Sequence, residues 1–338
     1  MATHDLRDIT IIGGGPTGLF ALFYAGMRGA TAQIVDALPE LGGQLTALYP
    51  EKDIFDVGGH PRILAKDLVR NLRLQAEQFH QPAHLNQNVI GLQEADGHFV
   101  LETMTDRFPT RAILIAAGIG AFSPRRLPQA CAAPWYGRGI FDKVLAPEAY
   151  RGKRVVIIGG GDTAFDWAVQ LQPRASALTL VHRSDRYRAH ASTVAEVNAH
   201  VAAGRMSLLP FHELHDVVGD GDRLAALELR DIKAKSTRRV DADVVLAMLG
   251  YVSDIGALAS WGLTLEKDEI LVNSRMETGR AGVYAAGDAV VYPGKLKLIV
   301  NGFGEAAIAV NQAVHYIDPA KKVDPGHSSN LAIFGQSE

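Results

Sequence analysis

Short apolar runs alternate with glycine clusters along this chain, and the first 36 residues set the pattern. Ile9–Ile12 is a run of aliphatic side chains interrupted by one threonine, which predicts a buried strand. A glycine-rich turn at residues 13–18 follows it. Leu19–Arg28 has apolar positions at helical spacing and ends at Gly29, a residue type that often closes a helix. Ala32–Val35 is a second strand-like run, so the segment predicts one strand–helix–strand unit.

The same order of elements returns in the middle of the chain. Arg154–Ile158 predicts a strand that enters a second glycine turn at residues 159–164. Phe165–Leu171 then predicts a helix, and Leu178–Val181 predicts the next strand. An internal repeat of this kind indicates two copies of one supersecondary unit. Because each copy forms a crevice that a nucleotide fills, the sequence predicts two nucleotide-binding domains.

Three further apolar runs indicate how the two domains share the chain. Residues 113–118 and 244–250 both predict strands that end in glycine, and residues 283–288 predict a third that ends in an acidic residue. If the second unit is inserted into the first domain, the chain crosses between domains after each of the first two runs. The expected fold class is α/β, with two Rossmann-like dinucleotide-binding domains. The expected bounds are residues 1–118 and 250–338 for the discontinuous domain and residues 119–249 for the inserted one.

The first glycine turn has the residues that bind a pyrophosphate. Gly13, Gly15 and Gly18 allow the backbone to approach the phosphates without a Cβ collision. The helix that follows offers free N–H groups and a positive dipole. Asp36 stands at the end of the next strand, where a carboxylate accepts hydrogen bonds from ribose hydroxyls. This turn therefore suits an adenosine whose 2′-hydroxyl is free.

The second turn keeps the glycine spacing but differs at the end of the next strand. Gly159, Gly161 and Ala164 repeat the fingerprint, yet Arg183 stands where the first unit has Asp36. A carboxylate repels a 2′-phosphate, whereas an arginine binds one through bidentate, charge-assisted hydrogen bonds. The turn is therefore predicted to bind NADP(H) rather than NAD(H). The residues expected to bind it are Gly159, Gly161, Asp162, Thr163, Ala164, His182, Arg183 and Arg188.

Two dinucleotide units with different selectivity imply two cofactors, one resident and one exchangeable. A flavin is the natural resident, because NADPH passes a hydride to it and the flavin then releases electrons singly or in pairs. The protein supplies position and shielding, while the cofactors supply the redox chemistry. The sequence therefore indicates FAD-dependent redox chemistry with NADPH as the donor.

Composition narrows the class of protein further. The chain has 338 residues, enough for about two domains, and a formal net charge of −3, which provides no overall basic field for nucleic acid or an anionic membrane. Cys131 is the single cysteine, so neither a dithiol pair nor a cysteine-rich metal site is expected within one chain. The 12 histidines show no metal-ligand spacing, and no metal site is proposed. The apolar runs are shorter than a bilayer span, and a cytoplasmic location is expected.

In combination, these motifs resemble the thioredoxin reductase superfamily of flavoproteins over nearly the whole chain. The resemblance depends on the two glycine turns, on Leu41–Leu45 with its Gly-Gly-Gln sequence, on Ala116–Gly118 and on Ala286–Asp288. It implies that both domains have a three-layer ββα form and that the first domain binds FAD. One departure decides the function: no Cys-x-x-Cys follows Gly137–Gly139, where a thioredoxin reductase has its dithiol.

Without that cysteine pair, the chain is similar to the thioredoxin-reductase-like type of ferredoxin–NADP reductase, a homodimeric branch. Tyr49, Phe122 and the extended tail with His327 carry this likeness. The resemblance implies that Tyr49 stacks on one face of the flavin, while the tail of the partner subunit brings His327 to the other face and Ser329 to the ring edge. The candidate catalytic residues beside the flavin are these three, and none acts as an acid or base. The implied FAD shell comprises Gly13, Gly15, Thr17, Gly18, Asp36, Gly43, Gln44, Tyr49, Val89, Phe122, Asp288 and Ser329.

The activity that this resemblance implies is FAD-dependent electron transfer between NADPH and ferredoxin or flavodoxin, reversible in principle. Two alternatives stay open: a flavin-containing regulatory protein, and an NADPH-dependent reductase of small disulfides, which uses a cysteine where this chain has Thr17. An acidic acceptor needs a positive docking surface. The candidates for that surface are Arg62, Lys66, Lys295 and Lys297.

Overall fold

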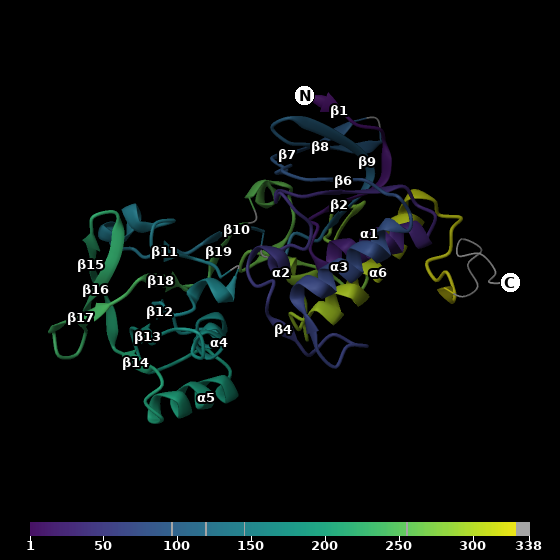
Figure 1. Ribbon diagram of the computed structural model, residues 1–338. Coiled ribbons are helices and arrows are strands. Elements are labelled where there is room, and N and C mark those ends of the chain that lie inside the picture. The colour runs from purple at the N-terminus through teal and green to yellow at the C-terminus, as the bar shows by residue number, and fades with distance from the viewer. Residues whose placement is uncertain (96, 119, 145, 255, 329–338) are drawn as a thin grey trace. The chain divides into compact units, whose positions relative to one another are not determined.

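The chain folds into two units. The computed structural model describes residues 1–328 apart from residues 96, 119, 145 and 255, and for residues 121–123 and 251–254 it describes the backbone alone (Figure 1). One unit comprises Met1–Phe122 and Ser253–Glu338, and the other comprises Ser123–Val252. The chain passes between the units through β10 (Ala121–Pro124) and β19 (Tyr251–Asp254), which pair with each other a few residues beyond the expected crossings.

The sheet of the first unit is built mainly from parallel strands. β2 (Arg7–Ile12) lies between β3 (Ala32–Val35) and β9 (Asp106–Ile115), and all three are parallel. β22 (Val283–Ala285) pairs with β9, so a strand from late in the chain completes a sheet that begins near its start. The remaining strands are β1 (Ala2–Thr3), β6 (Ala83–His84), β7 (Gly91–Ala95) and β8 (His98–Glu102).

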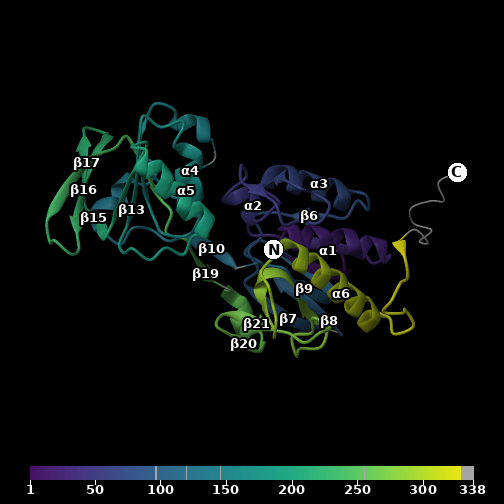
Figure 2. The same ribbon diagram turned by 90° about the horizontal axis from the view of Figure 1, so that it is seen from below.

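Three helices pack beside one another on this unit (Figure 2). α1 (Pro16–Met27) lies between α3 (Ala65–Glu77) and α6 (Ile299–Ile317). Their apolar faces form one buried core with the aliphatic side chains of β2, β3 and β9. Removal of this apolar surface from water is the main term that stabilises the unit.

The pairing register brings the carboxyl ends of four strands to one edge of the first sheet. Ile12 lies opposite Val35 and Ile115, and Ile115 lies opposite Ala285. Ligands of open α/β sheets bind at such an edge. The segments that follow these strands meet there: the first glycine turn, Asp36, residues 116–118 and residues 286–288.

The second unit has three layers around a parallel sheet. The strands of this sheet are, in order, β11 (Ile140–Phe141), β18 (Val244–Ala247), β12 (Arg154–Ile158), β13 (Ala177–His182) and β14 (Ser207–Pro210). α4 (Asp162–Leu171) and α5 (Ala191–Ala202) form the helical layer. The other layer is an antiparallel sheet of β15 (His212–Asp220), β16 (Arg223–Asp231) and β17 (Thr237–Asp241).

The side chains of β12 show how these layers share one sheet. Alternate residues of a strand point to opposite faces. Val155 and Ile157 belong to the buried cluster of α4 and α5, whereas Val156 and Ile158 belong to the cluster that contains the leucines of β16. In the first unit, β7, β8 and the start of β9 likewise form an antiparallel portion. The predicted α/β class with two Rossmann-like domains is confirmed.

Several short elements complete the two units. They connect the layers, and some of them contain residues of the functional site. The first unit contains α2 (Gln44–Ala47), β4 (Asp53–Ile54), β5 (Ile63–Leu64), β20 (Leu265–Glu266), β21 (Glu269–Leu271) and β23 (Val290–Val291). The 3₁₀ helices are η1 (Ala130–Trp135), η2 (Pro147–Tyr150), η3 (Gly256–Ser260) and η4 (Gly287–Ala289).

Both glycine turns pass into their helices earlier than the apolar spacing predicts. α1 begins at Pro16 rather than Leu19, and α4 begins at Asp162 rather than Phe165. In each case the N-cap is a glycine of the turn itself. The first-turn residues are small or polar, so they carry no apolar periodicity, although proline is typical of the first helical position. These early starts place the free helix N–H groups inside the turns.

Candidate functional site

The first glycine turn lies at the carboxyl end of β2. Gly13 has a φ of +104°, and a Cβ atom there would lie 2.5 Å from the carbonyl oxygen of Ala116. A Cβ atom on Gly18 would overlap the carbonyl oxygen of Gly13, so α1 and β2 approach more closely than any larger residue allows. Glycine is therefore required at both positions by the backbone of the turn.

α1 begins at this turn with free backbone donors. Its N-cap is Gly15, and no side chain caps the first turn. The first N–H groups of a helix have no partner within the helix. Together with the positive end of the helix dipole, they form a site for an anion such as a phosphate.

Asp36 follows β3 and is hydrogen-bonded to the turn. Its Oδ2 accepts from the backbone N–H of Gly14 at 2.5 Å, and its Oδ1 accepts from the backbone N–H of Leu38 at 2.7 Å. Asp36 is buried, and burial raises the pKa of its carboxyl group, although the two backbone hydrogen bonds oppose the shift. A carboxylate oxygen has two lone pairs, so each oxygen retains one for a ribose hydroxyl.

The Gly-Gly-Gln loop adjoins the same turn. Gly43 has a φ of +57°, and a Cβ atom there would lie 2.9 Å from the Cα of Gly15. Gln44 begins α2, and its Nε2 lies 3.5 Å from the position that a Cβ atom would take on Gly118. The structure thus brings Gly43 and Gln44 to the edge of the sheet where the strands end.

Thr17 lies where three segments meet. Gly287 has a φ of +78°, and a Cβ atom there would lie 2.8 Å from the Oγ1 of Thr17. A Cβ atom on Gly302, in the first turn of α6, would overlap the same hydroxyl. The first turns of α1 and α6 therefore converge with η4, which contains Asp288. Burial raises the pKa of Asp288, while the positive charges of nearby lysines lower it in part.

Tyr49 is half-buried against the core of the first unit. Burial raises the pKa of its phenol to about 12, and the nearby carboxylate of Asp288 adds to the shift. The Nζ of Lys52 lies 5.7 Å from the centre of the Tyr49 ring. The electrostatic coupling shows that Tyr49 and Asp288 are neighbours in the fold although they are distant in sequence.

Of the remaining predicted flavin residues, Val89 is the one whose side chain the structure describes. Val89 is half-buried and comes two residues after Gln87, whose N–H donates to the carbonyl oxygen of Asp36 at 2.8 Å. The side chain of Phe122 and the whole of Ser329 lie outside the described residues.

His327 is exposed, in a tail that is held at the other end of α1. The Nη2 of Arg28, the C-cap residue of α1, donates to the carbonyl oxygen of Lys322 at 2.6 Å. The glycine turn lies at the opposite end of the same helix, which is about 18 Å long at 1.5 Å per residue.

In the second glycine turn the backbone is closely packed at Gly159, as it is at Gly13 in the first turn, whereas the space beside Gly161 is open. A Cβ atom on Gly159 would overlap the carbonyl oxygen of Met248 and would lie 2.8 Å from the Cβ of Ala164. Gly161 is the uncapped N-cap of α4, and no atom lies within 4 Å of its Cβ position. The Oδ1 of Asp162 accepts from the backbone N–H of His190 at 2.8 Å, so this carboxylate binds its own chain.

Three arginines follow His182 at the end of β13. The His182 ring packs on Gly160, and burial lowers its pKa, as do the charges of Arg183 and Arg188. Arg183, Arg186 and Arg188 are exposed, and none has an ion-pair partner in the part of the chain that the structure describes. The backbone N–H of Arg188 donates to the carbonyl oxygen of Gly160 at 2.8 Å. These free guanidinium groups therefore make a positive surface beside the second turn.

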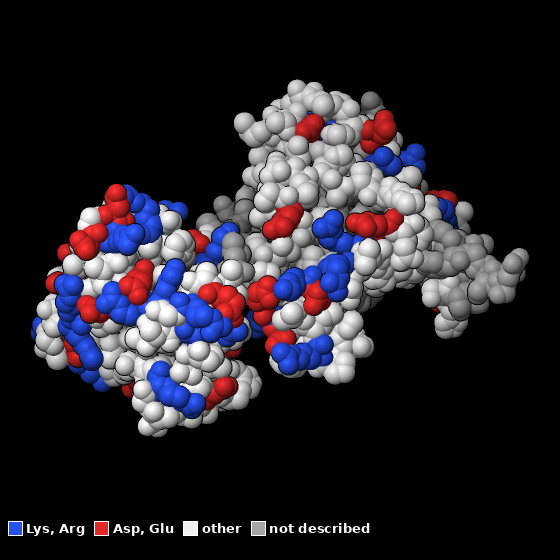
Figure 3. Space-filling model, viewed as in Figure 1, with Lys and Arg blue, Asp and Glu red and all other residues white. Residues whose placement is uncertain are grey.

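The expected docking surface on the first unit requires correction. Lys295 is buried and forms an ion pair, so it is not available to an acceptor. Figure 3 shows basic and acidic groups interspersed over the visible face, without a field of one sign. The other three candidates are exposed but paired: Arg62 with Asp53 at 2.8 Å, Lys66 with Glu51 at 2.8 Å and Lys297 with Glu269 at 2.6 Å.

Glu305 is a buried charge that was not predicted from the sequence as a site residue. Its side chain accepts hydrogen bonds from the N–H of Gly287, the hydroxyl of Tyr292 and the ammonium of Lys295. The sequence does contain a signal for it. Glu305 lies three residues after Gly302, on the face of α6 that buries alanines and valines, where a carboxylate needs partners.

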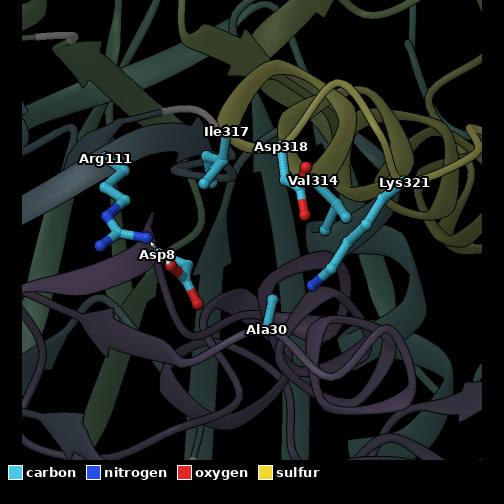
Figure 4. Close-up of a pocket in the computed structure, with 7 residues that line it drawn as sticks. All are labelled: Asp8, Ala30, Arg111, Val314, Ile317, Asp318 and Lys321. Atoms are coloured by element: carbon cyan, nitrogen blue, oxygen red, sulfur yellow. Dashed lines mark hydrogen bonds and ion pairs between the residues drawn. The ribbon is translucent and has the colours of Figure 1, made fainter.

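A pocket of about 340 Å³ lies at the opposite end of the first sheet from the glycine turn (Figure 4). Asp8, at the start of β2, pairs with Arg111 in its lining at 3.1 Å. None of the predicted site residues lines it. The lining residues are Asp8, Ala30, Arg111, Val314, Ile317, Asp318 and Lys321.

Cys131 has the environment of an unreactive thiol. It is half-buried, its Sγ lies 3.6 Å from the carbonyl oxygen of His215, and burial raises its pKa. Within residues 1–328 and their described side chains, no group of three His, Cys, Asp or Glu side chains has the geometry to hold a metal ion. No helix among the same residues is long and apolar enough to cross a membrane.

Comparisons with known proteins identify the family. Residues 7–313 match the pyridine nucleotide-disulphide oxidoreductase family. The ferredoxin–NADP reductase of Halalkalibacterium halodurans is 46% identical over 329 residues, which cover 97% of this chain and 98% of that protein. The ferredoxin–NADP reductase of Thermus thermophilus is 46% identical over 332 residues, 98% of this chain and 99% of that protein.

The fold has a counterpart among solved structures. The crystal structure of Lactococcus lactis thioredoxin reductase superposes with a TM-score of 0.78 at 21% identity, over 92% of this chain and 99% of that one. The thioredoxin-reductase-like fold predicted from the sequence is therefore confirmed. With these relatives, the chain belongs to the pyridine nucleotide-disulphide oxidoreductase family and, within it, to the ferredoxin–NADP reductases.

Proposed function

We propose that this protein transfers electrons between NADPH and ferredoxin through a bound FAD. The observation that carries the proposal is the contrast between two similar turns: a buried Asp36 follows the first, and an exposed, unpaired Arg183 follows the second. FAD, when bound, accepts a hydride from NADPH and passes its two electrons on singly. The names of the relatives support ferredoxin as the acceptor.

The first unit fits FAD in both shape and chemistry. The backbone cradle at Gly13 and Gly15 leaves no room for a Cβ atom on Gly13, and the uncapped N-terminus of α1 offers donors to a pyrophosphate. Asp36 retains acceptor capacity for a ribose, as an adenosine without a 2′-phosphate requires. The residues that would hold FAD are Gly13, Gly15, Thr17, Gly18, Asp36, Gly43, Gln44, Tyr49, Val89, Phe122 and Asp288.

The second unit fits NADP(H). Gly161 leaves open space at the N-terminus of α4 for a pyrophosphate, and Arg183 offers an unpaired guanidinium for a 2′-phosphate. Because Arg183 and Arg188 are exposed, a nucleotide would bind from solvent and be released into it without any unfolding of the turn. The residues that would bind it are Gly159, Gly161, Asp162, Thr163, Ala164, His182, Arg183 and Arg188.

A homodimer completes the proposal. Arg28 holds Lys322 at the end of α1 remote from the glycine turn, so the described tail is anchored far from its own chain's FAD residues. In a dimer, His327 and Ser329 of one copy would cover the flavin of the other. The cytoplasmic location expected from the sequence remains a prediction.

The test is NADPH-driven reduction of cytochrome c by the purified protein, with and without ferredoxin or flavodoxin, and with NADH at equal concentration. We expect strong stimulation by the protein acceptor and a preference for NADPH. Transfer to dyes without any acceptor effect, combined with reduction of small disulfides, would contradict the proposal. The Arg183→Gln variant is the matched control, because it should lose the preference for NADPH and keep the bound FAD.

A further inference from the structure

A deeply buried ion pair adjoins the segment that contains Asp288. The Nζ of Lys295 lies 2.5 Å from the Oε1 of Glu305, and the two side chains are 5% and 4% exposed. Lys295 is in the loop after β23, and Glu305 is in the second turn of α6. Every other lysine or arginine ion pair among the described residues is more exposed than this one.

Glu305 accepts hydrogen bonds from three residues of one loop. Its Oε2 accepts from the N–H of Gly287 at 2.7 Å, and its Oε1 accepts from the hydroxyl of Tyr292 at 2.6 Å as well as from Lys295. One carboxylate therefore closes residues 287–295 against α6. On its other side Gly287 abuts Thr17, so the backbone position of Asp288, the next residue, is limited from two directions.

This ion pair costs free energy that an apolar pair does not. Desolvation of two buried charges is expensive, and well-packed apolar residues in their place are often neutral or stabilising. An apolar pair holds a loop to a helix equally well. However, an apolar pair cannot accept a hydrogen bond from the N–H of Gly287, and it places no positive charge near Asp288. The pair therefore has a role that packing alone does not explain.

The charges of the pair act on Asp288 directly. Lys295 lowers the pKa of Asp288 and Glu305 raises it, against a background of burial that raises it most. Lys297 also lowers the pKa of Asp288, and Glu269 also raises it. Their side chains are 45% and 28% exposed, so their charges are screened by solvent. Inside the protein, screening is weaker, so the charges of Lys295 and Glu305 act on Asp288 with little attenuation by solvent.

We propose that Glu305 and Lys295 are positioning residues that hold Asp288 in place and keep this side of the flavin site electrically balanced. The inference rests on the proposed function, because it assumes that Asp288 lies beside FAD. Two-electron reduction of FAD with uptake of one proton makes the flavin one charge more negative, so a positive site favours the reduced form and a negative site favours the oxidised form. Loss of either charge should therefore shift the flavin equilibrium, in opposite directions for the two residues.

The experiment measures the two-electron reduction equilibrium of bound FAD in the holoprotein and three variants: Glu305→Gln, Lys295→Met and the double variant. Titration with dithionite and a reference dye needs neither NADPH nor ferredoxin, so failure of this inference is distinguishable from failure of the proposed function. The titrations are run at pH 6 and pH 8, because a buried charge without its partner shifts its pKa towards the neutral form. Lys297→Met is the matched control, since it removes the same charge from an exposed pair.

Relative to the wild type at the same pH, Glu305→Gln should raise the equilibrium constant for reduction about tenfold at pH 6, or about 30 mV for a two-electron couple. Lys295→Met should lower it about tenfold at pH 8. The double variant should return to within about threefold of the wild type, and Lys297→Met should lower it by less than Lys295→Met does, because the exposed charge is screened by solvent. Shifts of the same sign in both single variants, or no shift in either, would overturn the proposal.

A second readout covers variants that bind FAD poorly. The dissociation constant of FAD, measured by quenching of its fluorescence, should rise in each single variant and recover in the double variant. A merely structural role predicts the same recovery of FAD binding, because the double variant leaves no unpaired buried charge. The opposite signs of the two single variants in the reduction equilibrium therefore separate charge balance from a structural role. No recovery of FAD binding in the double variant would overturn the proposal.

Discussion

The turn after β2 and the turn after β12 have the same backbone plan but different surroundings. In the first, Asp36 is buried and both of its oxygens accept backbone N–H groups. In the second, Arg183 is exposed and has no ion-pair partner among the described residues. The residue proposed to bind the ribose of FAD is thus built into the fold, while the residue proposed to bind the 2′-phosphate of NADP(H) is left free in solvent.

Under the proposed function, this difference separates a resident cofactor from an exchangeable one. A ligand held by buried groups leaves only when those groups reorganise, whereas a ligand held at an exposed arginine exchanges readily. The first unit also closes over its turn with the Gly-Gly-Gln loop, α6 and η4, and the second turn is open at Gly161. Substitutions in and around the two turns therefore test whether the contrast holds.

The largest effect is expected from Gly13→Ala. The substitution combines a φ of +104° with a Cβ atom 2.5 Å from the carbonyl oxygen of Ala116, and the strain and the clash together should cost about 3 kcal/mol or more of the free energy of unfolding. FAD should be lost as well. Gly29→Ala is the control, because φ is +63° but no atom lies within 4 Å, and it should cost only about 1 kcal/mol. Equal losses in chemical denaturation of the two variants would contradict the steric account.

Arg183→Gln should weaken NADPH binding and leave FAD in place. Loss of a charge-assisted hydrogen bond to the 2′-phosphate should raise the KM for NADPH about 10- to 100-fold. NADH has no such phosphate, so its KM should change less than about twofold. Steady-state kinetics with both nucleotides measure the effect, and a parallel rise for NADPH and NADH would argue against a 2′-phosphate contact.

Asp36→Asn should change how stability depends on pH. Burial raises the pKa of Asp36 above its ordinary value of 3.8, so the folded apoprotein binds more protons than the unfolded chain between the two pKa values. The contribution of Asp36 to stability therefore falls as pH rises through that window. Relative to the wild type, Asp36→Asn should gain stability with rising pH in urea titrations.

Asp106→Asn gives the opposite sign and serves as the control for Asp36. A hydrogen bond from the side chain of Thr105 is the main cause that lowers the pKa of Asp106. The wild-type group therefore stabilises the fold above its ordinary pKa, and the variant should lose stability relative to the wild type as pH rises. The same slope for both variants would show that neither carboxylate has the environment described.

The smallest effect is expected from Cys131→Ala. The thiol is half-buried, its pKa is raised by burial, and it has no second cysteine in the chain. The turnover of NADPH with ferredoxin should stay within about twofold of the wild type, because no thiolate takes part. A large loss of turnover, measured with the same acceptor, would favour a disulfide reductase instead.

The sequence predicts the elements of both turns because their signals are local. The apolar run before Gly13, the glycine spacing and the acid after the next strand lie within one short stretch, and the same holds for Gly159 and Arg183. The sequence also predicts the strand at Val283–Ala285, since it lies in a compact apolar run that ends in an acidic residue.

The parts that could not be predicted depend on contacts between distant segments. The neighbourhood of Thr17, Gly287 and Gly302 exists only when α1 and α6 are packed together. The prediction that Lys295 belongs to a positive docking surface was wrong. The sequence of its loop does not indicate that the lysine side chain is buried in an ion pair with a glutamate of α6. Pairing of the exposed cations likewise follows from the fold and not from composition.

The most direct test of the central claim is to measure the dissociation constants of FAD and NADP⁺ in the wild type, Asp36→Asn and Arg183→Gln. The account predicts that Asp36→Asn weakens FAD binding at least about tenfold with NADP⁺ binding unchanged, and that Arg183→Gln does the reverse. Weaker FAD binding in Arg183→Gln, or weaker NADP⁺ binding in Asp36→Asn, would contradict the assignment of one cofactor to each turn.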